Sequence, residues 1–332
     1  FTRRMSIVES LFFSEKTSGR ALLDMVRRGE PAVYASGIRG SAGALAASLL
    51  FDALSRPLCI VTPTRDDALE MYSELLFFRN QEQSPECDVC FCPPPDTRPY
   101  EQVLVHCDVS ASRLWTLYRL SVSDRPLLIV TCARALQQRV GPQDVLIEAS
   151  CEIAVNDTLD REALLHKLIA CGYTRVNLVE DRGDISVRGE ILDIFPPGYA
   201  FPVRIDLFGD TVESMRMFDP QTQRSHTDLR CAHIVPVREL ILSPEVQDGL
   251  SVRMAENPQA FDGSRRQAFA ENLRNGFLPA GSDYCLSLVY EKTASLPDYL
   301  QPDTLATWCD PDESARQIGA LEQDVLAGFQ AS

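Results

Sequence analysis

The sequence lacks the features that would place it in a membrane or outside the cell. No run approaches the roughly 20 apolar residues of a membrane span, and no signal peptide precedes residues 1–5. Its 332 residues are 45% hydrophobic and 24% charged, as in soluble globular proteins. We therefore expect a cytoplasmic protein of two or three domains with no membrane partner.

Catalytic and metal-binding motifs are also scarce. The four histidines are dispersed, and the chain contains neither a His-Glu-x-x-His nor a Gly-x-Ser-x-Gly motif. Cys87, Cys90 and Cys92 are closely spaced, but no second Cys or His pair stands at zinc-site distance. An incidental cluster around a strand explains them better than zinc. We predict no catalytic residue and no metal.

Positive charge is in short supply. Lys and Arg number 32 against 47 Asp and Glu, which gives a formal net charge of −15. Binding to phosphate groups needs a concentrated basic surface, so this balance favours a protein partner over nucleic acid. The eleven cysteines are scattered through apolar segments, where a reduced Cys behaves as a small hydrophobe, and this fits a cytosolic compartment.

What is present in the first part is an alternation of strands and helices. Buried strands are predicted at 31–36, 58–62 and 127–131, and helices at 45–54 and 65–79. A glycine-rich loop at 37–44 joins the first strand to the first helix. This order is typical of a parallel α/β sheet.

From about residue 144 the pattern changes. Strands are predicted at 145–147 and 151–155, followed by a helix with Asp160 as its N-cap and Gly172 at its C-terminal stop. A sheet follows and closes near 233–236. After it, helices are predicted again at 243–257 and 263–275.

The most regular stretch lies at 203–218. Val203, Ile205 and Leu207 occupy one phase of a period-two pattern. Arg204 and Phe208 occupy the other phase and are predicted to point outward, about 13 Å apart. Gly209-Asp210 is a turn signal, and 212–218 is the returning strand.

In the preceding strand, Arg188 lies in the phase opposite Val187. An exposed aromatic beside arginines has the composition of an interface hot spot. A solvated sheet face with one stray aromatic is the alternative, since single exposed apolar residues are common.

Three segments of this sheet resemble a known module. They read Val-Arg-Gly-Glu-Ile-Leu-Asp-Ile-Phe-Pro, Pro-Val-Arg-Ile-Asp-Leu-Phe-Gly-Asp and Glu-Ser-Met-Arg-Met-Phe-Asp-Pro-Gln-Thr-Gln-Arg-Ser. The module is shared by the excision-repair protein UvrB and the transcription-repair coupling factors (Mfd), and in both families it binds UvrA. The resemblance implies that Arg188, Arg204 and Phe208 contact UvrA.

Two further features separate these families. The segments 94–101 and 108–118 resemble the coupling factors' acidic–Thr–x–Pro–Tyr–Glu turn and Ser-Arg-Leu helix. The tyrosine-rich hairpin with which UvrB probes DNA damage is absent. The resemblance therefore favours the amino-terminal UvrB-homology region of a coupling factor.

The glycine loop is a degenerate form of the nucleotide loop of related motor proteins, Gly-x-x-Gly-Ser-Gly-Lys-Thr. The corresponding positions here are Gly37, Gly40, Ser41, Ala42, Gly43 and Ala44. Gly43 stands where the motif has the phosphate-binding Lys, and Ala44 where it has the magnesium-binding Thr. We expect no ATP hydrolysis here. Residues 305–313, which resemble the motors' strand and acidic magnesium motif, are then inert.

The resemblance implies the following architecture and function. A degenerate P-loop (RecA/helicase-like) α/β domain is built from residues 1–147 and 236–332, with an α+β UvrA-binding domain inserted at 148–235. The chain recruits UvrA and links stalled RNA polymerase to excision repair. In the full-length family, other domains bind RNA polymerase and double-stranded DNA, use ATP and magnesium, and mask the UvrA-binding surface. The alternative is a fragment of a UvrB-type damage-verification ATPase.

Overall fold

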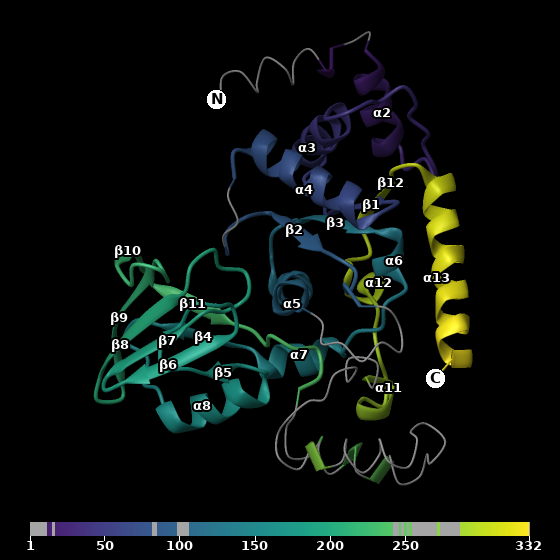
Figure 1. The fold of residues 1–332 in the computed structure, drawn as a ribbon. Coiled ribbons are helices and arrows are strands. Elements are labelled where there is room, and N and C mark those ends of the chain that lie inside the picture. Colours follow the sequence, from purple (N-terminus) through teal and green to yellow (C-terminus); the bar gives the residue numbers. More distant parts are fainter. Residues whose placement is uncertain are drawn as a thin grey trace.

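The computed structural model describes residues 12–14, 17–81, 85–97, 106–241 and 286–331, with a few isolated positions between 241 and 286. Figure 1 shows two regions. The α/β domain contains a parallel sheet with its helices, and the small domain contains the strands between residues 151 and 234.

The α/β domain is organised around a four-stranded sheet in the order β12-β1-β3-β2, with all paired neighbours parallel. Its strands are β1 (Leu58–Thr62), β2 (Val89–Cys92), β3 (Leu128–Cys132) and β12 (Leu305–Trp308). β1 and β3 are buried along their whole length, which explains their unbroken apolar sequences. The continuation of the sheet through 58–62 and 305–308 agrees with the sequence prediction.

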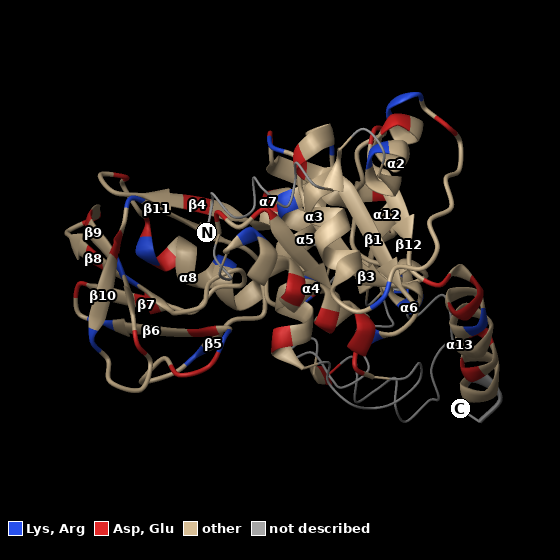
Figure 2. Cartoon of the chain, turned by 90° about the horizontal axis from the view of Figure 1, so that it is seen from above, with Lys and Arg blue, Asp and Glu red and all other residues tan. Residues whose placement is uncertain are grey.

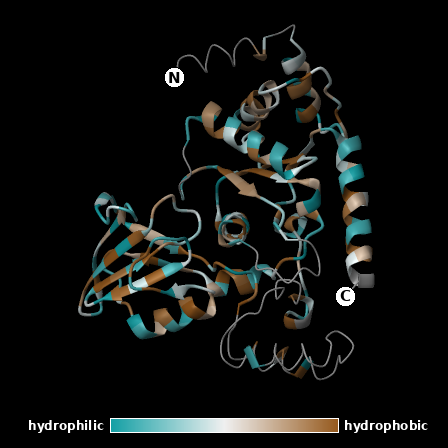
Figure 3. Cartoon of the chain, in the orientation of Figure 1, coloured by the Kyte–Doolittle hydropathy of each residue, from teal (hydrophilic) through white to brown (hydrophobic). Residues whose placement is uncertain are grey.

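Helices cover both faces of this sheet. α3 (Ala42–Leu54) and α4 (Arg65–Arg79) pack on one face, and α5 (Cys107–Val122) packs on the other, where Leu114 and Leu117 meet Ile129. Hydrophobic residues dominate the strands between these layers (Figure 3). The remaining helices of this domain are α2 (Ser18–Arg27), α6 (Ala133–Leu136), α7 (Gln143–Ala149), α11 (Leu286–Val289), α12 (Leu296–Tyr299) and α13 (Pro311–Ala331).

The small domain contains a six-stranded sheet in the order β10-β9-β8-β7-β6-β5, antiparallel except for β5 and β6. These strands are β5 (Thr174–Arg175), β6 (Asp184–Arg188), β7 (Ile191–Ile194), β8 (Val203–Phe208), β9 (Thr211–Phe218) and β10 (Ser225–Leu229). A second antiparallel pair joins β4 (Cys151–Ala154) to β11 (Cys231–Ile234). The predicted boundaries at 148 and 235 stay a prediction.

α8 (Arg161–Ala170) packs its apolar face against this sheet, where Leu164 and Leu168 join the core. The Asp160 side chain accepts a hydrogen bond from the Ala163 backbone N–H at 3.0 Å, so the predicted N-cap is confirmed. Gly172 follows the helix with a φ of +94°. A left-handed residue after a helix ends it, as the sequence predicted.

Two predicted strands are wrong. Residues 31–36 form no strand and belong to no ladder of the described sheet, and Tyr34 is 91% exposed. This short apolar run is mostly exposed and pairs with none of the strands of the described sheet. Residues 145–147 lie in helix α7, where Leu146 alone is buried, so this run supplies one helical contact rather than a strand face.

Several predictions lie outside the described residues. They are most of the helices at 243–257 and 263–275, half of the turn at 94–101, and the first residues of the chain. Among the described helices, none is both long and apolar enough to cross a membrane.

Candidate protein-binding face

The β8–β9 hairpin shows the burial pattern predicted from its sequence. Val203, Ile205 and Leu207 are buried in the core of the small domain, and Phe208 is 76% exposed. Gly209 has a φ of +61°, which favours glycine, and the turn contains only Gly209 and Asp210. The pairing shifts by one residue opposite Asp206 and Leu207, which marks a β-bulge in β9.

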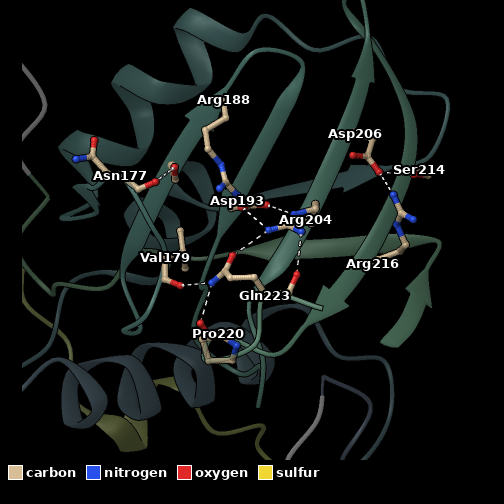
Figure 4. A network of polar contacts seen from close by, with 11 residues as sticks. Asn177, Val179, Arg188, Asp193, Arg204, Asp206, Ser214, Arg216, Pro220 and Gln223 are labelled. Carbon is tan, nitrogen blue, oxygen red and sulfur yellow. Dashed lines mark hydrogen bonds and ion pairs between the residues drawn. The ribbon is translucent and has the colours of Figure 1, made fainter. Parts of the chain in front are cut away.

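Arg204 lies on the outer face, but it is far less exposed than its strand phase predicted. Its side chain is only 14% exposed. Its Nε donates to Asp193 Oδ1 at 2.7 Å, and its Nη2 donates to Asp193 Oδ2 at 2.8 Å. The guanidinium also lies 4.3 Å from the centre of the Phe218 ring. Arg204 is therefore a braced, inward-held cation (Figure 4).

A small apolar cluster on the outer face explains this burial. Val179, Phe195 and Phe218 pack together there, away from the main core of the small domain. Gln223, in the turn after β9, donates to the backbone oxygens of Val179 at 3.4 Å and Pro220 at 2.8 Å. The loop that contains Val179 and the turn that contains Gln223 thus cover the end of the sheet where Arg204 lies. Strand phase alone takes no account of such covering segments.

Arg188 is placed differently. Its side chain is 46% exposed, and its Nη2 donates to Asp193 Oδ2 at 2.7 Å. Two arginines therefore share one carboxylate, which leaves a formal charge of +1 on the group. Arg188 pairs with Ile191, and Ile191 pairs with Asp206, two residues before Phe208. This register places Arg188 and Phe208 about 12 Å apart on the outer face.

Sequence reasoning missed Asp193 and Gln223. Asp193 is fully buried between Leu192 and Ile194 in β7. A carboxylate in an apolar strand must be paired, so the sequence Ile-Leu-Asp-Ile already signalled a buried partner for a cation. Gln223 carried no such signal, because its role depends on a left-handed turn (φ 59°) that its residue type does not dictate.

A second ion pair lies farther along the same face. Asp206 accepts hydrogen bonds from Ser214 Oγ at 2.8 Å and from Arg216 Nη2. Residues of both charge signs are interspersed over the small domain (Figure 2). The face thus combines paired charges with one strongly exposed aromatic, the composition expected at a protein interface.

The glycine loop offers no comparable arrangement. Gly37 and Gly40 have φ values of +81° and +52°, as in a tight turn. The Ser41 hydroxyl donates to the Glu74 carboxylate. Ala44 is fully buried against the core between α3, α4 and the sheet. An acidic side chain beside the loop disfavours a phosphate group.

Gly43 stands at the position of the motif's Lys. A Cβ placed on it would lie 3.6 Å from Met71 Cε and 3.8 Å from Ile38 Cγ2. Its surroundings are therefore apolar. Gly37, Gly40 and Ser41 lie in the turn before α3, whereas Gly43 and Ala44 lie in the first turn of that helix. The segment before them is not the predicted strand.

The clustered cysteines are core residues. Cys87 packs on the α4 side of the sheet, whereas Cys90 and Cys92 pack on the α5 side. Burial raises the pKa of the Cys90 thiol to about 12 and that of Cys92 to about 11, which keeps both protonated. Within the described part of the chain, no group of three or more His, Cys, Asp or Glu residues could hold a metal ion.

Comparison with known proteins gives one matching family model and a consistent set of relatives. Residues 151–240 match the UvrB interaction domain. The chain is 35% identical over 227 residues to the transcription-repair-coupling factor of Myxococcus xanthus, covering 68% of this chain and 19% of that protein. For the Escherichia coli (strain K12) factor the identity is 30% over 294 residues, covering 87% and 24%.

The transcription-repair-coupling factor of Bacillus subtilis (strain 168) is 26% identical over 306 residues, which cover 89% of this chain and 26% of that protein. The chain thus spans between about a fifth and a quarter of the length of these relatives. The chain belongs to the transcription-repair-coupling factor family, and residues 151–240 are its UvrB interaction domain.

Proposed function

We propose that the outer face of the small domain binds UvrA and that the chain acts as a recruiting module in transcription-repair coupling. The observation that carries this proposal is Phe208, 76% exposed beside a braced arginine group within the matched UvrB interaction domain. An aromatic fixed on a rigid strand loses little conformational entropy on binding. Arg188, Arg204 and Phe208 form the proposed site.

The proposed role is to mimic UvrB, so that a stalled RNA polymerase is linked to excision repair. RNA polymerase and double-stranded DNA would be bound by other parts of a full-length protein, and a carboxy-terminal domain would mask this face. The net charge of −15 supports a protein rather than a DNA partner for the chain itself. A cytoplasmic location follows from this role.

We further propose that the α/β domain is a RecA/helicase-like domain that has lost ATPase activity. Its parallel sheet with helices on both faces supports the first part. The second part is supported by Gly43 and Ala44 at the Lys and Thr positions and by the bond between Ser41 and Glu74. ATP and magnesium would serve the motor domains of the full-length family protein.

Binding of the chain to purified UvrA tests the proposal. We expect a dissociation constant of about 1 μM or lower, and a loss of at least about 100-fold in an Arg188→Ala, Arg204→Ala, Phe208→Ala variant. Phe77→Ala, which removes an exposed aromatic from α4, is the matched control and should bind like the parent. Absence of binding by the parent would refute recruitment, and equal binding by the triple variant would refute the site.

A thermal-shift titration tests the inactive nucleotide loop separately. ATP with magnesium should leave the melting temperature of the chain unchanged, because a ligand stabilises only the state that binds it. A concentration-dependent rise would instead support the UvrB-type ATPase alternative.

A further inference from the structure

Arg204 and Arg188 differ in how many of their donors are already used. A guanidinium has five N–H groups. Arg204 uses four of them. Its Nε–H and one Nη2–H donate to the Asp193 carboxylate. The other Nη2–H donates to Gln223 Oε1, and an Nη1–H donates to the Gln223 backbone oxygen. Arg188 uses one, on Asp193 Oδ2. Arg188 thus keeps most of its hydrogen-bonding capacity for a partner (Figure 4).

Asp193 connects the two. Its Oδ1 accepts from Arg204, and its Oδ2 accepts from both Arg204 and Arg188. The carboxylate itself is buried, so a partner protein cannot reach it. Gln223 holds the other edge of Arg204, and its own amide is fixed by the oxygens of Val179 and Pro220. The arrangement is a brace built from the sheet, the loop and the turn.

We propose that Asp193 is a positioning residue for UvrA binding, with Arg204 as an internal brace and Arg188 as the arginine that meets an acidic side chain of the partner. This inference rests on the proposed function. It assigns the partner a carboxylate opposite Arg188 and an apolar pocket for Phe208, about 12 Å away. Arg204 then contributes by holding Asp193 in place rather than by pairing with the partner.

The physical basis is preorganisation. A free arginine side chain loses rotamer freedom when an interface fixes it, and a guanidinium already tied at one end loses less. The charge of Asp193 works in the opposite direction, because it cancels one of the two arginine charges. Orientation and charge therefore predict opposite effects when the carboxylate is neutralised, and this makes the inference testable.

The central experiment measures UvrA binding by the full chain carrying Asp193→Asn, which keeps the shape and removes the charge. If Asp193 positions Arg188, the dissociation constant rises at least about tenfold even though the face becomes more positive. Unchanged or tighter binding would overturn the inference. Glu213→Gln, an exposed carboxylate on β9 with the same change in net charge, is the matched control and should not weaken binding.

A second pair of variants covers the case in which Asp193→Asn unfolds the domain. Arg188→Gln should weaken binding about tenfold, flatten its salt dependence and leave the urea midpoint nearly unchanged, because the side chain is half-exposed. Arg204→Gln should lower the urea midpoint and leave the salt dependence of the remaining binding intact. A lower urea midpoint for Arg188→Gln, together with a flattened salt dependence for Arg204→Gln, would contradict these roles of the two arginines.

A measurement without a partner separates this inference from the proposed function. In the free chain, the Nε–H of Arg204 should give a protected side-chain signal in ¹H–¹⁵N spectra, and Arg188 Nε–H should exchange quickly. Observing equal, rapid exchange for both would overturn the brace. If the parent chain failed to bind UvrA, recruitment would be refuted while this spectrum still reported the brace.

Discussion

The glycine loop and the outer face of the small sheet use their polar groups in different ways. In the loop, the Ser41 hydroxyl donates to Glu74, and the Ala44 side chain is buried in the core. On the outer face, a buried Asp193 holds two arginines, and one of them stays half-exposed. Both regions occupy surfaces that the sequence marks as functional, but charged groups are organised for contact on the small domain alone.

The two regions also differ in whether they bury a charged group. A buried carboxylate with two arginine partners costs desolvation that apolar residues of the same size would avoid. Its presence in an apolar strand therefore suggests a purpose beyond stability. The glycine loop has no buried carboxylate of this kind, and Gly43 and Ala44 carry no polar side-chain group.

The largest effect is expected at a buried ion pair between α5 and the segment after β11. Arg113 on α5 is 1% exposed; its Nε donates to Glu239 Oε1 at 2.5 Å, and its Nη1 donates to Pro93 O at 2.8 Å. Arg113→Ala leaves the buried Glu239 uncompensated and should lower the free energy of unfolding by about 3–5 kcal/mol in urea denaturation. The double variant Arg113→Met, Glu239→Leu should recover most of this loss. A loss under about 1 kcal/mol in the single variant would show that the Arg113–Glu239 ion pair is not needed for stability.

The next effect concerns packing of the small domain against α5. Gly198 has a φ of +83°, and a Cβ placed there would lie 2.2 Å from Trp115 Cδ2. Gly198→Ala should cost about 2–4 kcal/mol of unfolding free energy and change the tryptophan fluorescence, because the ring must move. Gly189→Ala is the matched control, with a φ of +62° and no atom within 4 Å, and should cost about 1 kcal/mol. An equal loss of unfolding free energy in the two variants would mean that the Trp115 ring can move aside without cost.

Restoring the hydroxyl in the glycine loop should destabilise the α/β domain without restoring nucleotide binding. Ala44→Thr places a larger polar group in a fully buried site and should lower the unfolding free energy by about 1–3 kcal/mol. Ala42→Thr, at an exposed neighbouring position, should have little effect. Stabilisation of the Ala44→Thr variant by ATP and magnesium in a thermal scan would show that the loop retains a phosphate site.

The smallest effect is a pH dependence of stability at the contact between α5 and β11. His233 Nδ1 lies 3.3 Å from the Tyr118 hydroxyl, and burial lowers the pKa of His233 below its usual 6.5, opposed by Glu152 at 3.7 Å. Because the unfolded chain binds this proton more readily, stability should fall as the pH drops below about 6.5. His233→Asn should reduce the change in urea midpoint between pH 7.5 and pH 5.5. An unaltered change would assign the acid sensitivity to other groups.

The relation between sequence and structure differs between β8 and the segment 31–36. In β8, alternate residues meet a core and solvent, so the pattern predicted burial correctly at Val203, Ile205, Leu207 and Phe208. Residues 31–36 carry a similar apolar run, yet they remain exposed, because a strand needs a neighbouring strand as well as propensity. Residues 145–147 form a helix for a related reason, since a three-residue run does not determine its own period.

The strand phases of the β8–β9 hairpin, the N-cap at Asp160, the absence of Lys and Thr from the glycine loop and the resemblance to the coupling factors could all be read from the sequence. These depend on residues close together in the chain. The folded structure was needed to show that Arg204 is held by several hydrogen bonds, whereas Arg188 donates one to Asp193 and stays half-exposed. The buried Asp193 accepts hydrogen bonds from both arginines at similar distances. Gln223, whose amide is bonded to the backbone oxygen of Val179, accepts from Arg204 and thereby selects it as the covered arginine. Such selection arises from packing between separated segments and cannot be read from the local pattern of either strand.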